Sequence, residues 1–355
     1  MTVGDTVERA LHARIAAHGH VTVAEFMETA LSGYYADRDP LGARGDFTTA
    51  PEVSQMFGEL IGLWSVDLWS RMGKPDSFLL AELGPGRGTL MADALRGARG
   101  APGFLKAASL HLVEINAALI TAQKAALHGF QPQWHRNFDS VPPGPMILIA
   151  NEFWDALPVH QFEMTPEGWR ERVIAPDGDG FKFSTAAPGA ELSLLRPAHR
   201  AAKPGDIAEV CPAGMRLASA IGRRLARTSG AALIIDYGPA ESGIGDSLQA
   251  LKRHRRHNPL QRPGTADLTA HVDFAALAEA ARDAGATAYG PQTQGAFLTA
   301  LGIDLRAETL KAKRDAETRA EIDAARERLI GAKGMGSLFK VLALASPDAA
   351  RPAGL

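Results

Sequence analysis

The sequence predicts an α/β fold built on a doubly wound, mostly parallel sheet. Short apolar runs alternate with stretches in which apolar residues recur at helical spacing. Near-continuous apolar strands are typical of a parallel sheet whose two faces are both covered by helices. A glycine-rich loop directly after the first run adds to this, because such loops join a strand to a helix in these folds. The apolar runs are 78–83, 110–114, 146–150 and 231–236.

The composition is that of a soluble globular protein. The 355 residues are 46% hydrophobic and 22% charged, and the formal net charge is −2. This charge argues against a globally basic, nucleic-acid-binding surface. The single cysteine, Cys211, excludes an internal disulfide, and no spacing of cysteine and histidine predicts a metal site. Cys211 is either a small packed side chain or a reactive thiol.

Residues 1–9 carry acids early and lack the apolar core of a signal peptide. No apolar run reaches the length of about 18 residues that a membrane span needs. We therefore expect a cytoplasmic protein without a membrane-inserted segment.

The chain is expected to form one main domain with additions. Helical spacing at Val7, Leu11 and Ile15 predicts an N-terminal helical segment. Alternating residues within 159–184 predict antiparallel strands inserted into the sheet domain, and the charged stretch 307–330 predicts a surface helix. The expected divisions are an N-terminal segment at 1–75, a main domain at 76–346 with insertions at about 159–205 and 239–270, and a disordered tail at 347–355.

The glycine loop is the first candidate binding site. Gly84, Gly86 and Gly88 follow the first strand, and glycine there lets a ligand approach the backbone closely. Dinucleotide sites use G-x-G-x-x-G spacing, whereas this loop has G-x-G-x-G preceded by Glu82. A carboxylate there is unfavourable for a pyrophosphate but suits a ligand with an ammonium and a sulfonium group. The pattern favours S-adenosylmethionine over NAD, with a purely structural turn as the alternative.

Glu114 ends the second strand, 28 residues after Gly86. A carboxylate at this position accepts hydrogen bonds from both ribose hydroxyls in dinucleotide-binding folds. The residue supports nucleoside binding without choosing between the two ligands, and a surface acid at a strand end is the alternative.

A second group of polar residues follows the strand 146–150, namely Asn151, Glu152 and Asp155. Carboxylates and an amide at the carboxyl end of a buried strand suit a cationic or hydrogen-bonding substrate. A helix cap is the alternative role for Asp155. His271 is a further candidate, with a structural role as its alternative, and the basic run 252–257 is either a solvated loop or a contact for an acidic partner.

Several longer motifs occur together and in order. Their combination resembles the MidA-like methyltransferases, a family that includes a mitochondrial complex I assembly factor acting on arginine. The resemblance covers residues from about 20 to 345. The motifs are Gly45 to Glu59, Leu83 to Leu90, Asn151-Glu152 with Asp155 to Pro158, Asp267 to Thr269 with His271 to Phe274, Thr293-Gln294, and Met335-Gly336 with Phe339 to Leu342.

The resemblance implies a class I methyltransferase fold that binds S-adenosyl-L-methionine. It implies that the segment from Gly45 to Glu59 closes over the cofactor, and that a protein arginine, on the mitochondrial analogy in a respiratory complex I subunit, is the methyl acceptor. The candidate cofactor residues are Gly45, Asp46, Thr49, Glu82, Gly84, Gly86, Gly88, Glu114 and Asn151.

Methyl transfer to arginine suggests roles for three residues. The guanidinium is planar and cationic, so carboxylates can hold it bidentately. Glu152 and Asp155 are the candidates for this, and His271 for accepting a proton or positioning the substrate. Other functions remain open: a small-molecule O- or N-methyltransferase, a cofactor-binding assembly chaperone without turnover, or an NAD oxidoreductase.

Overall fold

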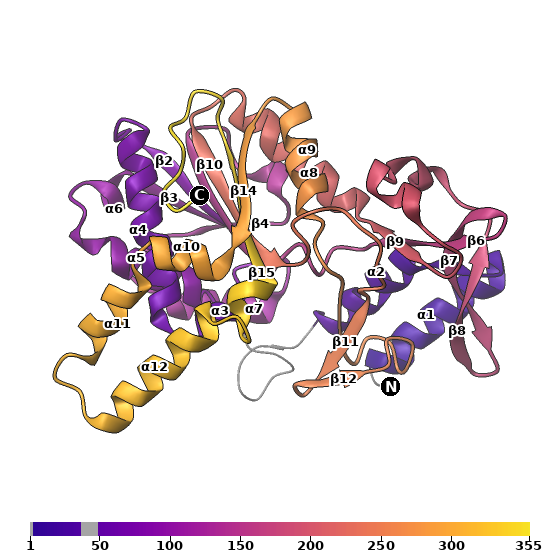
Figure 1. Cartoon of the computed structure of the whole chain (residues 1–355). Coiled ribbons are helices and arrows are strands. Elements are labelled where there is room, and N and C mark those ends of the chain that lie inside the picture. Colours follow the sequence, from indigo (N-terminus) through magenta and orange to yellow (C-terminus); the bar gives the residue numbers. More distant parts are fainter. Residues whose placement is uncertain (1–2, 37–48) are drawn as a thin grey trace. The chain divides into compact units, whose positions relative to one another are not determined.

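The computed structural model describes residues 3–36 and 49–355 (Figure 1). The chain divides into two compact units, each assembled from segments that lie far apart in the sequence. Unit 1 comprises residues 1–47, 154–216 and 241–273, and unit 2 comprises 48–153, 217–240 and 274–355.

Unit 2 contains the main sheet, with the strand order β14-β15-β10-β5-β2-β3-β4. Strands β4, β3, β2, β5 and β10 run parallel, whereas β15 is antiparallel to both β10 and β14. The four apolar runs became β2, β3, β5 and β10, so the expected α/β fold with a mostly parallel sheet is confirmed. The strands are β2 (Phe78–Leu83), β3 (Ala108–Val113), β4 (Gln133–His135), β5 (Met146–Asn151), β10 (Gly230–Tyr237), β14 (Thr287–Thr293) and β15 (Phe339–Ala345).

The helices of unit 2 cover this sheet, and α4 packs against α5, β5 and β10. Helices α4 and α5 approach each other closely because α4 has a glycine at the contact. A Cβ on Gly62 of α4 would fall 2.1 Å from the carbonyl oxygen of Ala94 in α5. The helices are α3 (Ala50–Val53), α4 (Gln55–Arg71), α5 (Thr89–Gly97), α6 (Phe104–Ala107), α7 (Ala117–Ala126), α9 (Phe274–Asp283), α10 (Gln294–Ala300), α11 (Ile303–Lys311), α12 (Ala316–Ile330), α13 (Met335–Leu338), and the 3₁₀ turns η1 (Ala98–Gly100) and η2 (Phe138–Ser140). Helix α8 (Pro212–Leu225) begins in unit 1 and continues into unit 2.

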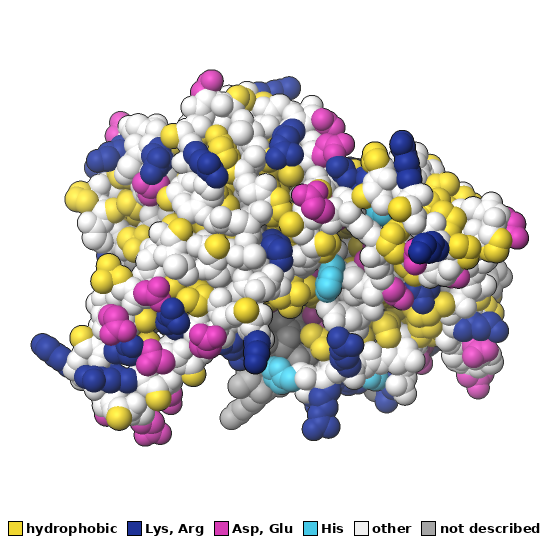
Figure 2. All heavy atoms as spheres, viewed as in Figure 1, with side chains coloured by type: hydrophobic (Ala, Val, Ile, Leu, Met, Phe, Trp, Pro, Cys, Tyr) yellow, Lys and Arg dark blue, Asp and Glu magenta, His cyan; other side chains and the backbone are white. Residues whose placement is uncertain are grey.

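The charged stretch 307–330 contains two helices instead of the single one expected. Helix α11 ends at Lys311, and α12 begins after Asp315, whose carboxylate accepts a hydrogen bond from the backbone N–H of Thr318 at 2.8 Å. An aspartate capping a helix start in this way competes with continuation of the preceding helix. The surface character is as expected, since basic and acidic side chains alternate over α11 and α12 (Figure 2).

The described residues of unit 1 form antiparallel sheets and helices. Strands β1, β7, β6 and β9 pair in that order with β8 on β7, and β12, β11 and β13 form a second sheet. These include the antiparallel strands expected within 159–184. The elements are α1 (Val3–His18), β1 (Val21–Thr22), α2 (Val23–Tyr34), β6 (His160–Thr165), β7 (Gly168–Asp177), β8 (Gly180–Ala186), η3 (Ala190–Leu194), η4 (Pro197–Ala201), β9 (Ile207–Val210), β11 (Gln249–Lys252), β12 (Arg255–His257) and β13 (Asp267–Thr269).

The core of unit 1 joins its separate segments. Leu11 of α1 and Phe26 of α2 are fully buried in one apolar cluster with Ile174 of β7 and Leu268 of β13. Helix α2 begins with a capping box, in which the backbone N–H of Thr22 donates to the Glu25 carboxylate and the backbone N–H of Glu25 donates to the Thr22 hydroxyl. In the part of the chain that the structure describes, no helix has the length and hydropathy of a membrane span.

The last residues of the chain lie on unit 2. Ala349, Ala353 and Leu355 pack against its apolar core, and the Tyr289 hydroxyl donates to the carbonyl of Ala349 at 3.4 Å. The sequence indicated a tail without structure here, because short polar and proline-containing ends usually lack partners. Small apolar side chains in this segment supply the contacts.

Candidate cofactor site

The glycine loop and Asn151 lie at the edge of the sheet where its strand order reverses. Strands β2 and β5 are neighbours, and Leu83 at the end of β2 is in register with Ala150 of β5. From this pair the chain order proceeds outward in both directions, to β3 and β4 on one side and to β10 on the other. Ligands of open α/β sheets bind at the carboxyl ends of strands at such a switch point.

The three loop glycines all have left-handed backbone. Their φ angles are 59° at Gly84, 53° at Gly86 and 83° at Gly88, values that other residues adopt only with strain. A Cβ on Gly84 would fall 2.8 Å from the Phe153 ring, so the loop has no room for a side chain there. Gly88 caps α5, whose first N–H groups face the loop.

Glu82 is a buried carboxyl group just before the loop. It is 3% exposed, and among the described residues its Oε2 atom has no hydrogen-bond partner. Burial raises its pKa to about 8. An uncompensated carboxylate in an apolar environment is unfavourable, so a positively charged group placed beside it would be stabilised. This observation fits a ligand with ammonium and sulfonium groups.

Asn151 supplies a second buried acceptor. Its amide nitrogen donates to Glu152 Oε1 at 3.0 Å, while its Oδ1 atom is buried without a partner in the described chain. Two unsatisfied acceptors at neighbouring strand ends are unusual in a folded interior. The residues present thus fit S-adenosylmethionine, which carries several donors.

Glu114 lies at the end of β3 as expected, and its carboxylate is held in place. Oε1 accepts from the backbone N–H groups of Ile115 and Asn116 at 2.8 Å each, and Oε2 accepts from Gln123 at 3.3 Å. Burial raises the pKa of this half-buried group, and these hydrogen bonds oppose the rise. Carboxylate oxygens accept more than one hydrogen bond, so ribose hydroxyls can still be bound.

Sequence reasoning missed Gln123, although the sequence contained a signal. It lies four residues after Leu119 and four before Leu127, on the apolar stripe of α7. An amide on a buried stripe requires partners, and Gln123 is fully buried.

The Glu152 side chain is hydrogen-bonded to the first residue of α3. Its Oε1 atom accepts from the backbone N–H of Ala50 at 2.9 Å, and its φ of 51° is left-handed. Non-glycine residues in this conformation often mark functional sites. Asp236, fully buried, fixes the following turn by accepting from the backbone N–H of Phe153 at 3.1 Å. Thr49 precedes α3, whereas Gly45 and Asp46 lie outside the described residues.

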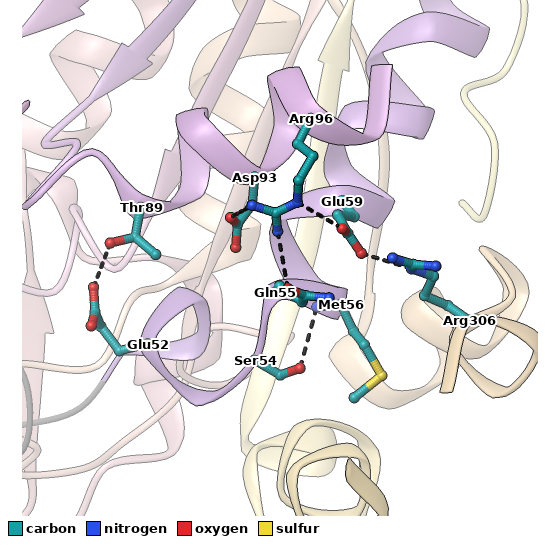
Figure 3. A network of polar contacts seen from close by, with 9 residues as sticks. All are labelled: Glu52, Ser54, Gln55, Met56, Glu59, Thr89, Asp93, Arg96 and Arg306. Atoms are coloured by element: carbon teal, nitrogen blue, oxygen red, sulfur yellow. Dashed lines mark hydrogen bonds and ion pairs between the residues drawn. The ribbon is translucent and has the colours of Figure 1, made fainter. Parts of the chain in front are cut away.

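A network of ion pairs joins α4 to the helix that follows the glycine loop (Figure 3). Near the loop, Thr89 donates to Glu52 at 2.6 Å. Further along, Arg96 of α5 donates to Glu59 at 2.9 Å and pairs with Asp93 at 2.7 Å. The first turn and the last turn of α5 are therefore both tied to the α3–α4 segment.

Asp155 and His271 belong to unit 1, where Asp155 is not a helix cap. It is 7% exposed in a turn, and its backbone carbonyl accepts from the N–H of Ala270 at 2.9 Å. His271 is exposed, and its backbone N–H donates to Ser247 Oγ at 2.7 Å. The Tyr35 hydroxyl donates to Asp267 at 3.0 Å, and burial together with Asp267 and Asp155 raises the pKa of Tyr35 well above its usual value. Asp267 belongs to one of the motifs of the family resemblance, whereas Tyr35 was not singled out from the sequence.

Two other candidates have structural explanations. The basic run 252–257 forms a β-hairpin, since β11 and β12 pair across a turn at Arg253 and His254. Burial raises the pKa of the Cys211 thiol to about 11, which favours a packed side chain over a reactive one.

Comparison with known proteins identifies the class of this site. Residues 60–292 match the family model of the S-adenosyl-L-methionine-dependent methyltransferases. A crystal structure of a superfamily member from Burkholderia thailandensis, bound to S-adenosyl-homocysteine, superposes with a TM-score of 0.86 at 27% identity. It covers 99% of this chain and 94% of that one. The cofactor of this family is S-adenosyl-L-methionine, as the glycine loop predicted.

Curated relatives extend the match over nearly the whole chain. The protein arginine methyltransferase NDUFAF7 of Rattus norvegicus is 38% identical over 95% of this chain and 83% of its own length. That of Homo sapiens is 38% identical, with 95% and 82% covered. The homologue of Drosophila melanogaster is 35% identical, with 96% and 84% covered.

These relatives also correct one expectation. All three are named as mitochondrial proteins, which contradicts the cytoplasmic location inferred from residues 1–9. The composition of residues 1–9 shows only whether this segment resembles a targeting sequence. It does not determine the compartment in which the folded protein acts. The glycine loop, the buried acceptors beside it and the relatives agree, and the chain belongs to the S-adenosylmethionine-dependent methyltransferases.

Proposed function

We propose that this protein transfers a methyl group from S-adenosylmethionine to the side chain of an arginine in a protein. The observation that carries the proposal is the 38% identity, over 95% of the chain, to proteins named protein arginine methyltransferase. Buried acidic groups in unit 1 support a cationic acceptor, since Asp155 and Asp267 are 7% and 3% exposed.

On the donor side, we assign the cofactor to the loop and the strand ends around it. Gly84, Gly86 and Gly88 supply a close backbone approach, and Glu114 accepts from the ribose hydroxyls. Glu82 and Asn151 offer their unpaired oxygens to the cationic end of the ligand. Gly45, Asp46 and Thr49 complete the set as candidates on the covering segment. When bound, the cofactor supplies an electrophilic methyl group on a sulfonium.

On the acceptor side, we assign Glu152 and Asp155 to the guanidinium. Transfer is an in-line displacement that depends chiefly on alignment. Two carboxylates hold the planar cation and keep positive charge away from the attacking nitrogen. His271, whose side chain is exposed while its backbone is fixed by Ser247, accepts the proton that nitrogen releases.

We further propose that the protein substrate is a subunit of respiratory complex I. The family resemblance implies this class of substrate, and the arginine methyltransferase relatives support a protein as acceptor.

The test compares variants in the presence of labelled cofactor and cell extract. Asp155→Asn should lose labelling of the protein band while keeping its affinity for S-adenosylhomocysteine, measured by calorimetry. Asp177→Asn is the matched control, because Asp177 is an exposed acid of the same unit paired only loosely with Lys182. Mass spectrometry then identifies the modified residue.

The outcomes separate the alternatives. A labelled metabolite without a labelled protein would indicate a small-molecule methyltransferase, and cofactor binding without any transfer would indicate an assembly chaperone. Labelling of a residue other than arginine would overturn the assignment of the acceptor.

A further inference from the structure

Gln123 makes three polar contacts although it is fully buried. Its amide nitrogen donates to the carbonyl of Gly86 at 2.7 Å and to Glu114 Oε2 at 3.3 Å. Its amide oxygen accepts from the indole nitrogen of Trp134 at 2.8 Å. One side chain thus connects the middle of the glycine loop with the carboxylate at the end of β3.

The chemistry of the partners determines which way the amide points. An indole N–H can only donate, and a carbonyl oxygen can only accept. The oxygen of Gln123 must therefore face Trp134, and its two N–H groups face Gly86 and Glu114. No flipped amide would satisfy the same three groups, so Trp134 sets the orientation of the other two contacts.

The contacts reach both parts of the proposed cofactor site. Gly86 has a left-handed φ of 53°, and its carbonyl accepts a hydrogen bond from the Gln123 amide. Backbone N–H groups hold only Oε1 of Glu114, so Gln123 fixes the remaining oxygen. Helix α7 also packs directly on the loop exit, since a Cβ on Gly88 would fall 3.3 Å from Gln123 Cα.

We propose that Gln123 is a positioning residue for S-adenosylmethionine, which sets the glycine loop and the Glu114 carboxylate at the spacing that the bound nucleoside requires. The proposal rests on the assignment of Gly86 and Glu114 to the cofactor. Gln123 acts through these two residues and does not need to touch the ligand. Trp134 takes part by keeping the amide in its required orientation.

The test measures affinity for S-adenosylhomocysteine and thermal stability in the same variants. Gln123→Met keeps the length of the side chain and removes its hydrogen bonds, and it should weaken binding at least about tenfold. Trp134→Phe leaves the N–H donors of Gln123 in place but removes the indole N–H that orients the amide. The affinity for S-adenosylhomocysteine should therefore fall less, by about two- to fivefold.

A double variant distinguishes positioning from a merely structural role. If Gln123 acts through Glu114, adding Gln123→Met to Glu114→Gln should weaken binding less than the two single effects combined. For the same reason, Gln123→Met should affect S-adenosylhomocysteine more than its 2′,3′-dideoxy analogue, which lacks the ribose hydroxyls.

Two results would overturn the proposal. One is a Gln123→Met protein that melts at a lower temperature yet binds S-adenosylhomocysteine as tightly as the wild type. The other is full additivity with Glu114→Gln. If Glu114→Gln itself left the affinity unchanged, the assignment of Glu114 to the cofactor would fail instead, which is a separate outcome.

Discussion

Glu59 of α4 and Arg306 of α11 form an ion pair at 2.7 Å, although 247 positions separate them in the sequence. The other oxygen of Glu59 accepts from Arg96 of α5, so one carboxylate joins three helices (Figure 3). Glu59 is 4% exposed. The two guanidinium groups compensate the buried negative charge of Glu59. Removing that charge should therefore lower the stability of the folded state.

The first prediction concerns this carboxylate. Glu59→Gln keeps the shape of the side chain but removes the charge from both pairs, and should lower the free energy of unfolding by about 2 kcal/mol. Urea denaturation measures the change. Lys182→Ala is the control, because its partner Asp177 is exposed and such pairs stabilise little. An unchanged urea midpoint for Glu59→Gln would mean that desolvation already offsets the attraction.

The second prediction concerns the pKa of Glu82, which burial raises from 4.5 to about 8. The folded protein then holds a proton that the unfolded chain has lost between these two values. The stabilising contribution is present in full below pH 4.5 and is lost as the pH rises toward 8. Glu82→Gln cannot ionise, so relative to the wild type it should gain up to about 4 kcal/mol between pH 5 and pH 8. Urea unfolding at both pH values measures this, and parallel curves for the two proteins would contradict it.

The third prediction concerns Gly84. An alanine there would need a left-handed backbone and would press its Cβ into the Phe153 ring, so the loop must move. Affinity for S-adenosylhomocysteine should fall at least about tenfold. Gly100→Ala is the matched control, since a Cβ there would meet nothing within 4 Å. Equal affinities of both variants in calorimetry would show that the loop does not contact the ligand.

The fourth prediction concerns His111, which is 1% exposed and lies 2.9 Å from the His135 ring nitrogen. Burial, followed by the effect of His135, lowers its pKa from 6.5 to about 4. The unfolded chain therefore takes up a proton first as the pH falls, and stability is lost from pH 6.5 toward pH 4. His111→Gln should reduce this loss. The check is the urea midpoint at pH 7 and pH 4.5, where an equal drop in both proteins would rule His111 out.

The sequence predicted those parts of the fold that short segments determine by themselves. Strands β2, β5 and β10 are buried along nearly their whole length, so their apolar runs stood out. Strand β14 was not predicted, because it is half-exposed along its length and contains Pro291. Its place in the sheet depends on pairing with β15, a contact that no local pattern encodes.

The candidate site shows the same limit. The glycine loop and Glu82 were found because local spacing carries the information. Gln123 was missed because its inferred role depends on hydrogen bonds with Gly86 and Trp134, which are 37 and 11 positions away in the sequence. Its place on the apolar stripe of α7 indicates burial, but not which groups the amide contacts.

The discontinuous build of unit 1 has a consequence for its synthesis. Helices α1 and α2 are synthesised before the residues that cover Leu11 and Phe26, which include Ile174 and Leu268. Some 240 residues must therefore follow Phe26 before the last of these partners has been made. At an elongation rate of about 5–20 residues per second, more than about ten seconds pass between the synthesis of Phe26 and that of Leu268. The apolar faces of both helices are incompletely covered during this time. During that interval, the incompletely covered apolar faces are open to aggregation or chaperone binding, and a chain truncated before Leu268 would lack part of their cover.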